Sequence, residues 1–384
     1  MATPIDLHIP PSTSTVNVSI IEPGTFLKGM PSSMFLEPAI PGHEYLAAPC
    51  FSFLIQHPTQ NRTLVFDLGI KKDWENWPKP VYEGIIEGLG ATPFVPKDVR
   101  EVLDEHGIDT KNIEAVIWSH SHVDHTGDVS IFEKRTKLIV GNGAKADVFP
   151  GYPTNKHASF NESEVAGHEV EEIDFSSSPL KIGGFTAVDY FADGSFYLLN
   201  TPGHCLGHIC GFARVTSDPD SFILMGGDGV HHGGELRPHP WHPLPEQILP
   251  NPFDAASPTP CPGGIFDKLL PNGREAPFYK PSQKPHSVHH DVSIAEETIR
   301  GLQKIDGHDN VLIVPAHDAA FLNVADFFPK TANAFVEKGW VQKTRWAWLA
   351  AFAQAVGQDE DIPRKLFGDA RPISKGTTET AKSH

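Results

Sequence analysis

The 384-residue sequence contains no uninterrupted apolar run of about 18 residues, the length needed to cross a membrane. Its start, MATPIDLHIPPSTSTVNV, lacks a basic segment and a long apolar segment, so it does not have the pattern of a secretory signal. It also lacks internal repeats and low-complexity blocks. These absences predict a soluble, cytoplasmic protein that does not bind membranes.

Cysteine and basic residues are also scarce. Cys50, Cys205, Cys210 and Cys261 match neither a zinc-knuckle spacing nor a disulfide framework, which predicts free thiols. The 31 Lys and Arg stand against 48 Asp and Glu, giving a formal charge of −17. Because so acidic a chain repels phosphate backbones, nucleic acid is not expected as a partner. The expected partner is a small-molecule substrate, bound by a monomer or homodimer.

Hydrophobic residues make up 39% of the chain, enough for a packed core. Short apolar runs of strand length recur and end at Gly, Pro or polar turns. They are CFSFLI, TLVFDLG, EAVIWSH, TKLIVG, SFYLLNTPGH, SFILMGGD and NVLIVPAHD. Helical patterns lie between some of them, including PKDVREVLDEHG, SIAEETIRGLQKI and WVQKTRWAWLAAFAQAV. In the second of these, Ser293 and Glu296 have capping-box spacing, and the buried stripe is expected to start at Ile294. Strands interleaved with helices predict an α/β layered domain.

We divide the chain into three parts. Residues 1–15 are expected to form a flexible arm, 16–356 the folded domain, and 357–384 a C-terminal tail. Within the domain, residues 232–290 have little periodicity and are rich in Pro, Gly, His and aromatic residues. The aromatic residues argue against disorder, so this insert is predicted to be a cap over a site.

The segment WSHSHVDHTGD, residues 118–128, follows the apolar run of EAVIWSH. Side chains two apart in an extended segment point the same way, so His120 and His122 can converge on one point. Asp124 and His125 lie further round the turn and can face a second point. Imidazole and carboxylate groups are suitable ligands for Zn, Mn, Fe or Co.

Other residues of these types follow other apolar runs. His204 comes after YLLNTPG, Asp228 after FILMGG and His317 after VLIVPA. In open α/β sheets, ligands gather outside the carboxyl ends of the strands. The pattern therefore predicts that these three side chains join the histidine-rich segment in one site.

This ordered set resembles the metallo-β-lactamase superfamily. The motifs are HSHVDH, TPGH, GGD and PAH, together with VFDLG, in which Asp67 matches an early Asp-x-Gly. The spacing is most similar to that of the N-acyl-homoserine lactonase branch. The resemblance implies a four-layer αββα sandwich with an irregular active-site cap insert and a two-metal site.

The resemblance also implies roles for these residues. His120, His122 and His204 would hold one metal, and Asp124, His125 and His317 a second, with Asp228 bridging both. Asp67 would orient a ligand histidine. Two divalent ions are implied; ligands without cysteine suit zinc, and Fe, Mn or Co are possible. Asp124 and His231 are the expected catalytic residues.

One position departs from the lactonase pattern. Lactonases of this branch carry a tyrosine three residues after the bridging aspartate, whereas GDGVHH places His231 there. An imidazole can donate a hydrogen bond or a proton, so the change is compatible with hydrolysis. Because of this change, the sequence does not determine which kind of substrate ring the enzyme would open.

The resemblance implies a hydrolase in which a hydroxide shared by two metals attacks an acyl carbon. The expected substrate is a cyclic ester (lactone) or cyclic amide (lactam) of a small apolar or aromatic molecule. Alternatives are a thioesterase of the glyoxalase II type, a phosphodiesterase or sulfatase, and an iron-dependent redox enzyme of the same fold. A binding module that has lost its ligands is a further alternative, against which the intact ligand set argues.

Overall fold

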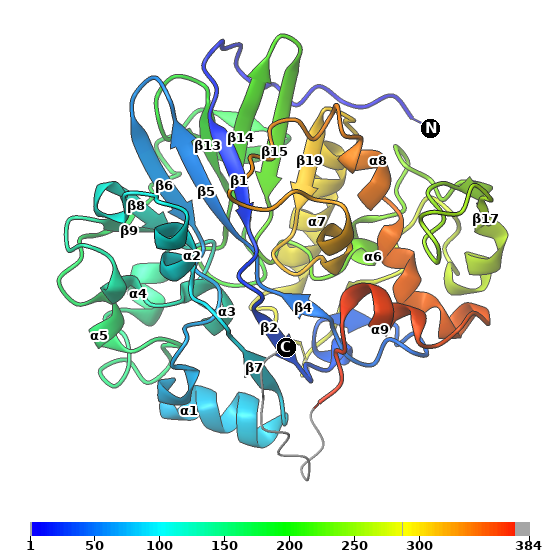
Figure 1. The fold of residues 1–384 in the computed structure, drawn as a ribbon, viewed down its shortest axis with the longest axis horizontal. Coiled ribbons are helices and arrows are strands. Elements are labelled where there is room, and N and C mark those ends of the chain that lie inside the picture. The colour runs from blue at the N-terminus through cyan, green and yellow to red at the C-terminus, as the bar shows by residue number, and fades with distance from the viewer. Residues whose placement is uncertain (1, 286, 373–384) are drawn as a thin grey trace.

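Two six-stranded sheets form the centre of the computed structural model, which describes residues 2–285 and 287–372 (Figure 1). The first sheet has the order β1-β5-β6-β8-β9-β10. Its strands are β1 (Asn17–Ile21), β5 (Ser52–His57), β6 (Arg62–Phe66), β8 (Ala115–Ile117), β9 (Lys137–Val140) and β10 (Val170–Glu172). β6, β8, β9 and β10 run parallel, so their carboxyl ends lie along one edge of the sheet.

The second sheet has the order β11-β12-β13-β14-β15-β19. Its strands are β11 (Lys181–Ile182), β12 (Phe185–Asp189), β13 (Phe196–Asn200), β14 (Ile209–Ser217), β15 (Asp220–Met225) and β19 (Val311–Val314). β15 and β19 are parallel, whereas β13, β14 and β15 pair antiparallel. All seven apolar runs quoted above contain strands of these two sheets, as predicted.

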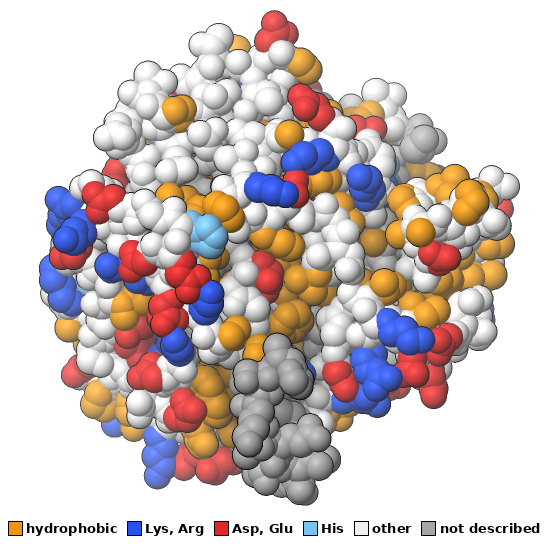
Figure 2. All heavy atoms as spheres, viewed as in Figure 1, with side chains coloured by type: hydrophobic (Ala, Val, Ile, Leu, Met, Phe, Trp, Pro, Cys, Tyr) orange, Lys and Arg blue, Asp and Glu red, His pale blue; other side chains and the backbone are white. Residues whose placement is uncertain are grey.

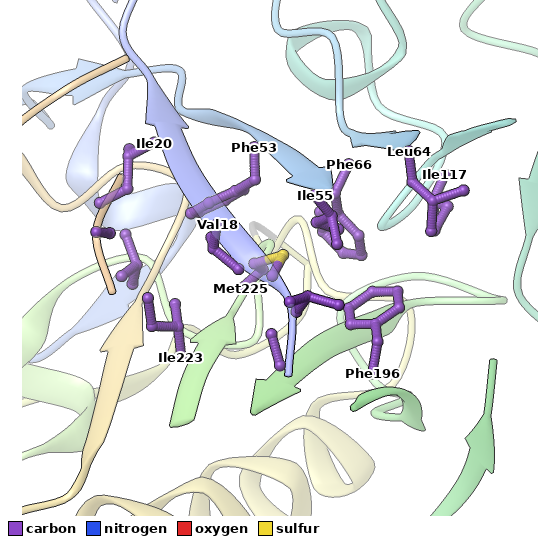
Figure 3. Close-up of a cluster of buried hydrophobic side chains, with 14 of the residues drawn as sticks. Val18, Ile20, Phe53, Ile55, Leu64, Phe66, Ile117, Phe196, Ile223 and Met225 are labelled. Carbon is purple, nitrogen blue, oxygen red and sulfur yellow. The ribbon is translucent and has the colours of Figure 1, made fainter. Parts of the chain in front are cut away.

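The main hydrophobic core lies between the two sheets. Figure 3 shows side chains such as Phe53 and Phe66 of the first sheet near Phe196 and Met225 of the second. These residues alternate along their strands with residues that face outward, because successive side chains of a strand point to opposite faces. The inward-facing side chains of the two sheets therefore pack against each other, and the sheets lie face to face.

Helices cover the outer face of each sheet. On the first sheet, Val99 and Leu103 of α2 (Val99–Glu105) pack with outward-facing strand residues such as Val116. On the second, Leu302 of α7 (Val292–Asp306) packs against residues such as Leu224. The layers are thus helix, sheet, sheet and helix, which confirms the predicted αββα sandwich.

Shorter elements surround these layers. Further helices are α1 (Lys79–Tyr82), α3 (Val123–Thr126), α4 (Ala144–Val148), α5 (Glu162–Val165), α6 (Gly233–Leu236), α8 (Trp340–Thr344) and α9 (Ile362–Phe367). Short strands form three small sheets: β2 (Phe26–Lys28), β4 (Ala48–Pro49) and β7 (Thr92–Phe94); β3 (Leu36–Glu37) and β18 (Lys280–Pro281); β16 (Gln247–Ile248) and β17 (Cys261–Pro262). The region 232–290 has few regular elements, but Phe266 and Phe278 are buried in a cluster with Trp348 and Phe352.

Two helix predictions differ in detail from the structure. Asp291, not Ser293, caps α7, because its side chain accepts a hydrogen bond from the backbone N–H of Ile294 at 3.0 Å. The side chain of Ile294 is 38% exposed and is not part of the buried stripe. The predicted late helix is broken into α8 and two 3-10 turns, 347–352 and 354–356. It breaks because Trp340 packs in the core between the sheets, whereas Trp348 packs in the cluster beneath residues 232–290.

The ends of the described chain contact the body of the protein. In the arm, Leu7 is buried and its carbonyl accepts a hydrogen bond from the N–H of Gly183 at 3.0 Å. The segment predicted as a tail contains α9, and its residues 373–384 lie outside the described part. All four cysteines are buried free thiols, as predicted.

The surface drawn in Figure 2 carries acidic and basic side chains interspersed, with no continuous basic patch on that face. Within residues 2–285 and 287–372, no helix is both long enough and apolar enough to span a bilayer.

Candidate metal centre

The histidine-rich segment leaves the end of β8 and folds back over the first sheet. The indole N–H of Trp118 donates to the carbonyl of Thr126 at 3.0 Å, which closes the segment into a compact turn. His122 has an extended backbone and precedes the one-turn helix α3, which carries Asp124 and His125. The change from extended chain to helix turns the second pair of side chains away from the first.

The second sheet supplies the other three side chains from the ends of its strands. His204 follows β13, Asp228 follows β15 and His317 follows β19. Gly227 lies where the two sheets approach each other, with a positive φ of 49°. A Cβ on Gly227 would lie 2.8 Å from the Cβ of Ser119, so glycine permits the close approach.

A first group contains His120, His122 and His204. Nδ1 of His122 lies 2.9 Å from Nε2 of His120 and 2.9 Å from Nε2 of His204. Oδ2 of Asp228 is 3.4 Å from Nε2 of His204 and 3.8 Å from Nε2 of His120. The four residues offer atoms within 4.8 Å of one another and could hold a metal ion.

A second group contains Asp124, His125 and His317. The Nε2 atoms of the two histidines are 3.3 Å apart. The carboxylate of Asp124 lies 3.8 Å from Nε2 of His125 and 3.4 Å from Nε2 of His317. This group could also hold a metal ion.

Asp228 lies between the two groups. Its Oδ1 is 3.2 Å from Nε2 of both His125 and His317, whereas its Oδ2 faces His120 and His204. One carboxylate therefore directs one oxygen to each group. This is the geometry that a residue bridging two ions requires.

The donor atoms fit metal ions better than they fit one another. His122 Nδ1 faces two ring nitrogens, but a ring nitrogen carries either one proton or one lone pair and can serve only one partner. Oδ1 of Asp228 is buried without a hydrogen-bond partner among the described residues. Burial lowers the pKa of His120 and of His204 well below the usual range, which favours the neutral imidazole that binds metals.

Hydrogen bonds set the orientation of these histidine rings. Nδ1 of His125 lies 2.9 Å from Oδ2 of Asp67, and Nδ1 of His317 lies 2.7 Å from the carbonyl of Pro49. Both partners accept hydrogen bonds, so Nδ1 carries a proton and Nε2 is the ring nitrogen that faces the group. Asp67 thus contacts His125 and lies outside both groups.

His208 supports Asp228 from the protein side. Its Nε2 accepts a hydrogen bond from the backbone N–H of Asp228 at 3.0 Å, and its Nδ1 lies 2.9 Å from the carbonyl of Thr201. The ring is fully buried, and both of its nitrogens are engaged in these contacts. His208 therefore positions Asp228 and is not a member of either group.

His231 lies beside the first group. Its Nε2 is 3.3 Å from Oδ2 of Asp228, and its ring centroid is 4.7 Å from that of His204. Burial favours its neutral form, but the carboxylates of Asp228 and Glu235 outweigh burial and raise the pKa of His231 to about 9. The structure thus brings together all the residues selected from the sequence.

Two residues at the site were not selected from the sequence. Glu235, fully buried, approaches Nδ1 of His231 to 3.6 Å. The ring centroid of His289 lies 5.1 Å from that of His231. The spacing of four between His231 and Glu235 could have indicated the first contact. No local pattern could have indicated the second, because the two histidines are 58 positions apart in the sequence.

A cavity of about 280 Å³ borders the site. His231 and His317 lie at its buried end, and Trp348, Ala351 and Phe367 line an apolar wall. Much of its remaining lining comes from residues 42–47, 318–320 and 360–371.

Comparison with known proteins identifies the family. The family model described as Metallo-beta-lactamase superfamily matches residues 46–249. The chain is 42% identical over 355 residues to Gamma-lactamase FDB1 of Fusarium pseudograminearum (strain CS3096), covering 91% of this chain and 85% of that protein. It is 40% identical over 359 residues to Metallo-hydrolase mfmC of Annulohypoxylon moriforme, covering 92% of each.

Among solved structures, B. thuringiensis AiiA with N-decanoyl-L-homoserine bound at its active site is similar in fold. The TM-score is 0.55 at 16% identity, covering 83% of this chain and 99% of that one. The chain therefore belongs to the metallo-beta-lactamase superfamily. Within that superfamily it is a metallohydrolase.

Proposed function

We propose that this metallohydrolase opens a cyclic ester or a cyclic amide of a small apolar or aromatic molecule, using two divalent metal ions. The observation that carries the proposal is the placement of Asp228, whose two carboxylate oxygens face two separate groups of ligand atoms. The names of a γ-lactamase relative and of an N-acyl homoserine lactone hydrolase of the same fold support the reaction class.

His120, His122 and His204 would hold one ion, Asp124, His125 and His317 the other, and Asp228 both. A set of imidazole and carboxylate ligands without cysteine suits zinc. Bound ions would supply an activated water and polarise the acyl oxygen of the substrate. Asp67 and the carbonyl of Pro49 would keep His125 and His317 in the tautomer that such ions need.

The chain's own residues would handle the rest of the reaction. His231, in the position of the lactonase tyrosine, would interact with the heteroatom that leaves when the ring opens. The apolar wall formed by Trp348, Ala351 and Phe367 would bind the part of the substrate that does not react and exclude water from it.

The cavity favours an uncharged substrate over a glutathione thioester. Its two arginines are each paired with an acidic neighbour, Arg364 with Asp361 at 3.1 Å and Arg371 with Asp369 at 2.8 Å. The carboxylates of a glutathione group would have to compete with these ion pairs.

The test combines metal analysis with a substrate panel of lactones, lactams, thioesters and phosphodiesters. We expect about two equivalents of transition metal and turnover of a lactone or lactam. His120→Ala and Asp124→Ala should lose both metal and turnover, whereas His157→Ala, which changes an exposed histidine, should lose neither. Less than one equivalent of metal, or unchanged hydrolysis in either site variant, contradicts the proposal. Bound iron with substrate-dependent oxygen uptake would instead indicate the redox alternative.

The role of His231 is tested separately. His231→Phe should keep its metal but lose about 100-fold or more in kcat, the usual contribution of a positioned acid–base group. Unaltered turnover would make His231 a structural residue.

A further inference from the structure

The imidazole of His231 lies between two buried carboxylates. On one side, its Nε2 is 3.3 Å from Oδ2 of Asp228. On the other, Oε2 of Glu235 accepts a hydrogen bond from the backbone N–H of His231 at 2.6 Å and lies 3.6 Å from its ring Nδ1. Glu235 thus hydrogen-bonds the backbone of His231 and lies within ion-pair distance of its ring, whose two nitrogens have no hydrogen-bond partner among the described residues.

Glu235 has no other charged partner among the described residues. It is fully buried in α6, and its Oε1 lacks a hydrogen-bond partner in that part of the chain. Burying a carboxylate is unfavourable unless it is paired, and a neutral amide could accept the same backbone hydrogen bond. The ring of His231 is therefore the one evident ion-pair partner of this carboxylate.

The backbone holds this arrangement in place. The N–H of Glu235 donates to the carbonyl of His232 at 2.9 Å, within the turn that starts α6. A Cβ on Gly233 would lie 2.3 Å from Trp348, so the turn is packed tightly against the cavity wall. The backbone that carries Glu235 is therefore held close to His231 by that packing.

The imidazole of His289 packs against the ring of His231. His289 is buried, and neither of its nitrogens has a hydrogen-bond partner among the described residues. Backbone hydrogen bonds fix its neighbourhood, since the N–H of His290 donates to the carbonyl of His204 at 2.8 Å. His289 therefore packs against both His231 and His204 of the first ligand group.

We propose that Glu235 is a positioning residue whose carboxylate holds the ring of His231 in its place beside Asp228, so that Nε2 faces the leaving heteroatom of the opened ring. The role of Nε2 toward the substrate rests on the proposed function. The way in which Glu235 holds the ring of His231 is argued from the structure alone. Glu235 itself does not touch the substrate.

The first test uses Glu235→Gln, which can still accept the backbone hydrogen bond of His231 and should fold normally. We expect a loss of about 10- to 100-fold in kcat, as is usual when a residue that orients a functional histidine is changed, with KM and metal content nearly unchanged. Glu275→Gln, which changes an exposed carboxylate in the segment 271–281, is the control and should keep full turnover.

A double-mutant cycle separates positioning from a structural role. If Glu235 acts through His231, Glu235→Gln should cause no further loss of kcat in a His231→Phe background. Independent losses that multiply would overturn the proposal. So would unchanged kcat in Glu235→Gln alone.

A spectroscopic readout needs no turnover and so remains valid if the proposed function fails. In protein labelled with ¹⁵N-histidine, the signals missing from His231→Phe identify the ring of His231. Glu235→Gln should shift these ring signals in both metal-free and zinc-loaded protein, whereas Glu275→Gln should leave them unchanged. Ring signals of His231 that do not change in Glu235→Gln would overturn the proposal.

The group His204, His231 and His289 supplies one more check, because its ligand atoms also lie within 4.8 Å of one another. Metal analysis of His289→Phe should give the same count as wild type. A third equivalent of metal that disappears in this variant would overturn the proposal, because Nε2 of His231 would then bind an ion.

Discussion

Asp67 joins the ends of two strands through its two carboxylate oxygens. Oδ1 accepts from the backbone N–H of Ser119 at 2.6 Å, and Oδ2 lies 2.9 Å from Nδ1 of His125. Its backbone has a positive φ of 58°, a conformation that aspartate adopts more readily than most residues. A single residue thus sets the path of the chain after β6 and the tautomer of a proposed ligand.

Asp67→Asn should weaken metal binding by about 10- to 100-fold, the usual effect of changing a residue that orients a ligand histidine. The amide oxygen can still accept from Ser119, but the amide nitrogen would then face Nδ1 of His125, where two donors conflict. Competition with a chelator measures the affinity. Asp128→Asn is the control, because Asp128 accepts from the N–H of Ser130 and contacts neither group. Equal affinity in wild type and Asp67→Asn would show that Asp67 does not orient His125.

At the scale of elements, the start of α7 packs directly on the loop that carries His204. Gly203 has a φ of 121°, and a Cβ on it would lie 2.3 Å from the backbone nitrogen of Ala295. The N–H of Asp291 also donates to the carbonyl of Gly203 at 3.0 Å. The helix that covers the second sheet therefore also fixes the position of one proposed ligand.

Gly203→Ala should lower the free energy of unfolding by about 2–4 kcal/mol, the sum of overpacking and a disfavoured backbone conformation. It should also reduce metal affinity, because relief of the clash displaces His204. Gly273→Ala is the control, because Gly273 also has a positive φ, of 85°, but open space around its Cβ, and the change should cost only about 1 kcal/mol. Urea unfolding of metal-free protein measures both values; equal losses in the two variants would contradict the packing argument.

The late helix illustrates how tertiary packing overrides local pattern. Trp340 and Trp348 lie eight positions apart, a spacing that places them within about 80° of each other on a regular helix. The structure buries them in two different clusters, and Trp346 between them departs from helical geometry. The helical pattern does not indicate this division, and only the position of the two clusters decided that the chain must bend.

At the scale of the whole molecule, the proposed metal centre connects the two sheets. Asp124 and His125 follow the first sheet, whereas Asp228 and His317 follow the second. Ions bound here would link the two halves of the sandwich directly. Ligands that bind only the folded state stabilise it by mass action.

Metal removal should therefore destabilise the whole protein and not only the loops. At a hundredfold excess of free zinc over the dissociation constant, each independent site contributes about 2.7 kcal/mol to the free energy of unfolding. We expect a chelator to lower the unfolding temperature and added zinc to restore it. In the His120→Ala, Asp124→Ala double variant, zinc should have little effect. A wild-type unfolding temperature that does not respond to zinc would contradict this prediction.

Acid should destabilise the protein through buried neutral histidines outside the metal centre. His43 is buried beside Tyr279, with Nδ1 2.7 Å from its hydroxyl, and burial lowers the pKa of His43 to about 4. In the unfolded chain the pKa is about 6.5, so between these values the unfolded state binds more protons. The contribution of His43 is therefore fully present above pH 6.5 and falls as the pH falls toward 4.

The loss from His43 should reach up to about 3 kcal/mol at pH 4. Urea unfolding of metal-free protein between pH 7 and 4.5 measures it, since chelation removes the separate effect of acid on metal binding. His43→Gln can keep a hydrogen bond to Tyr279 but does not titrate, so stability should fall less steeply with acid. His157→Gln, at an exposed position, should leave the slope unchanged. Equal slopes in wild type and His43→Gln would contradict the assignment.

The sequence by itself determined the strands and the selection of the clustered residues, and its resemblance to the metallo-β-lactamase superfamily implied the αββα layers. Strand alternation and ligand types are local properties, and His120 to His125 lie within six positions. Only the tertiary structure decided that Asp228 directs one oxygen to each group, that Trp348 lines the cavity, and that Glu235 and His289 flank His231. Those relations depend on where the two sheets and the 232–290 region meet, and contacts between distant segments leave no periodic signal in the chain.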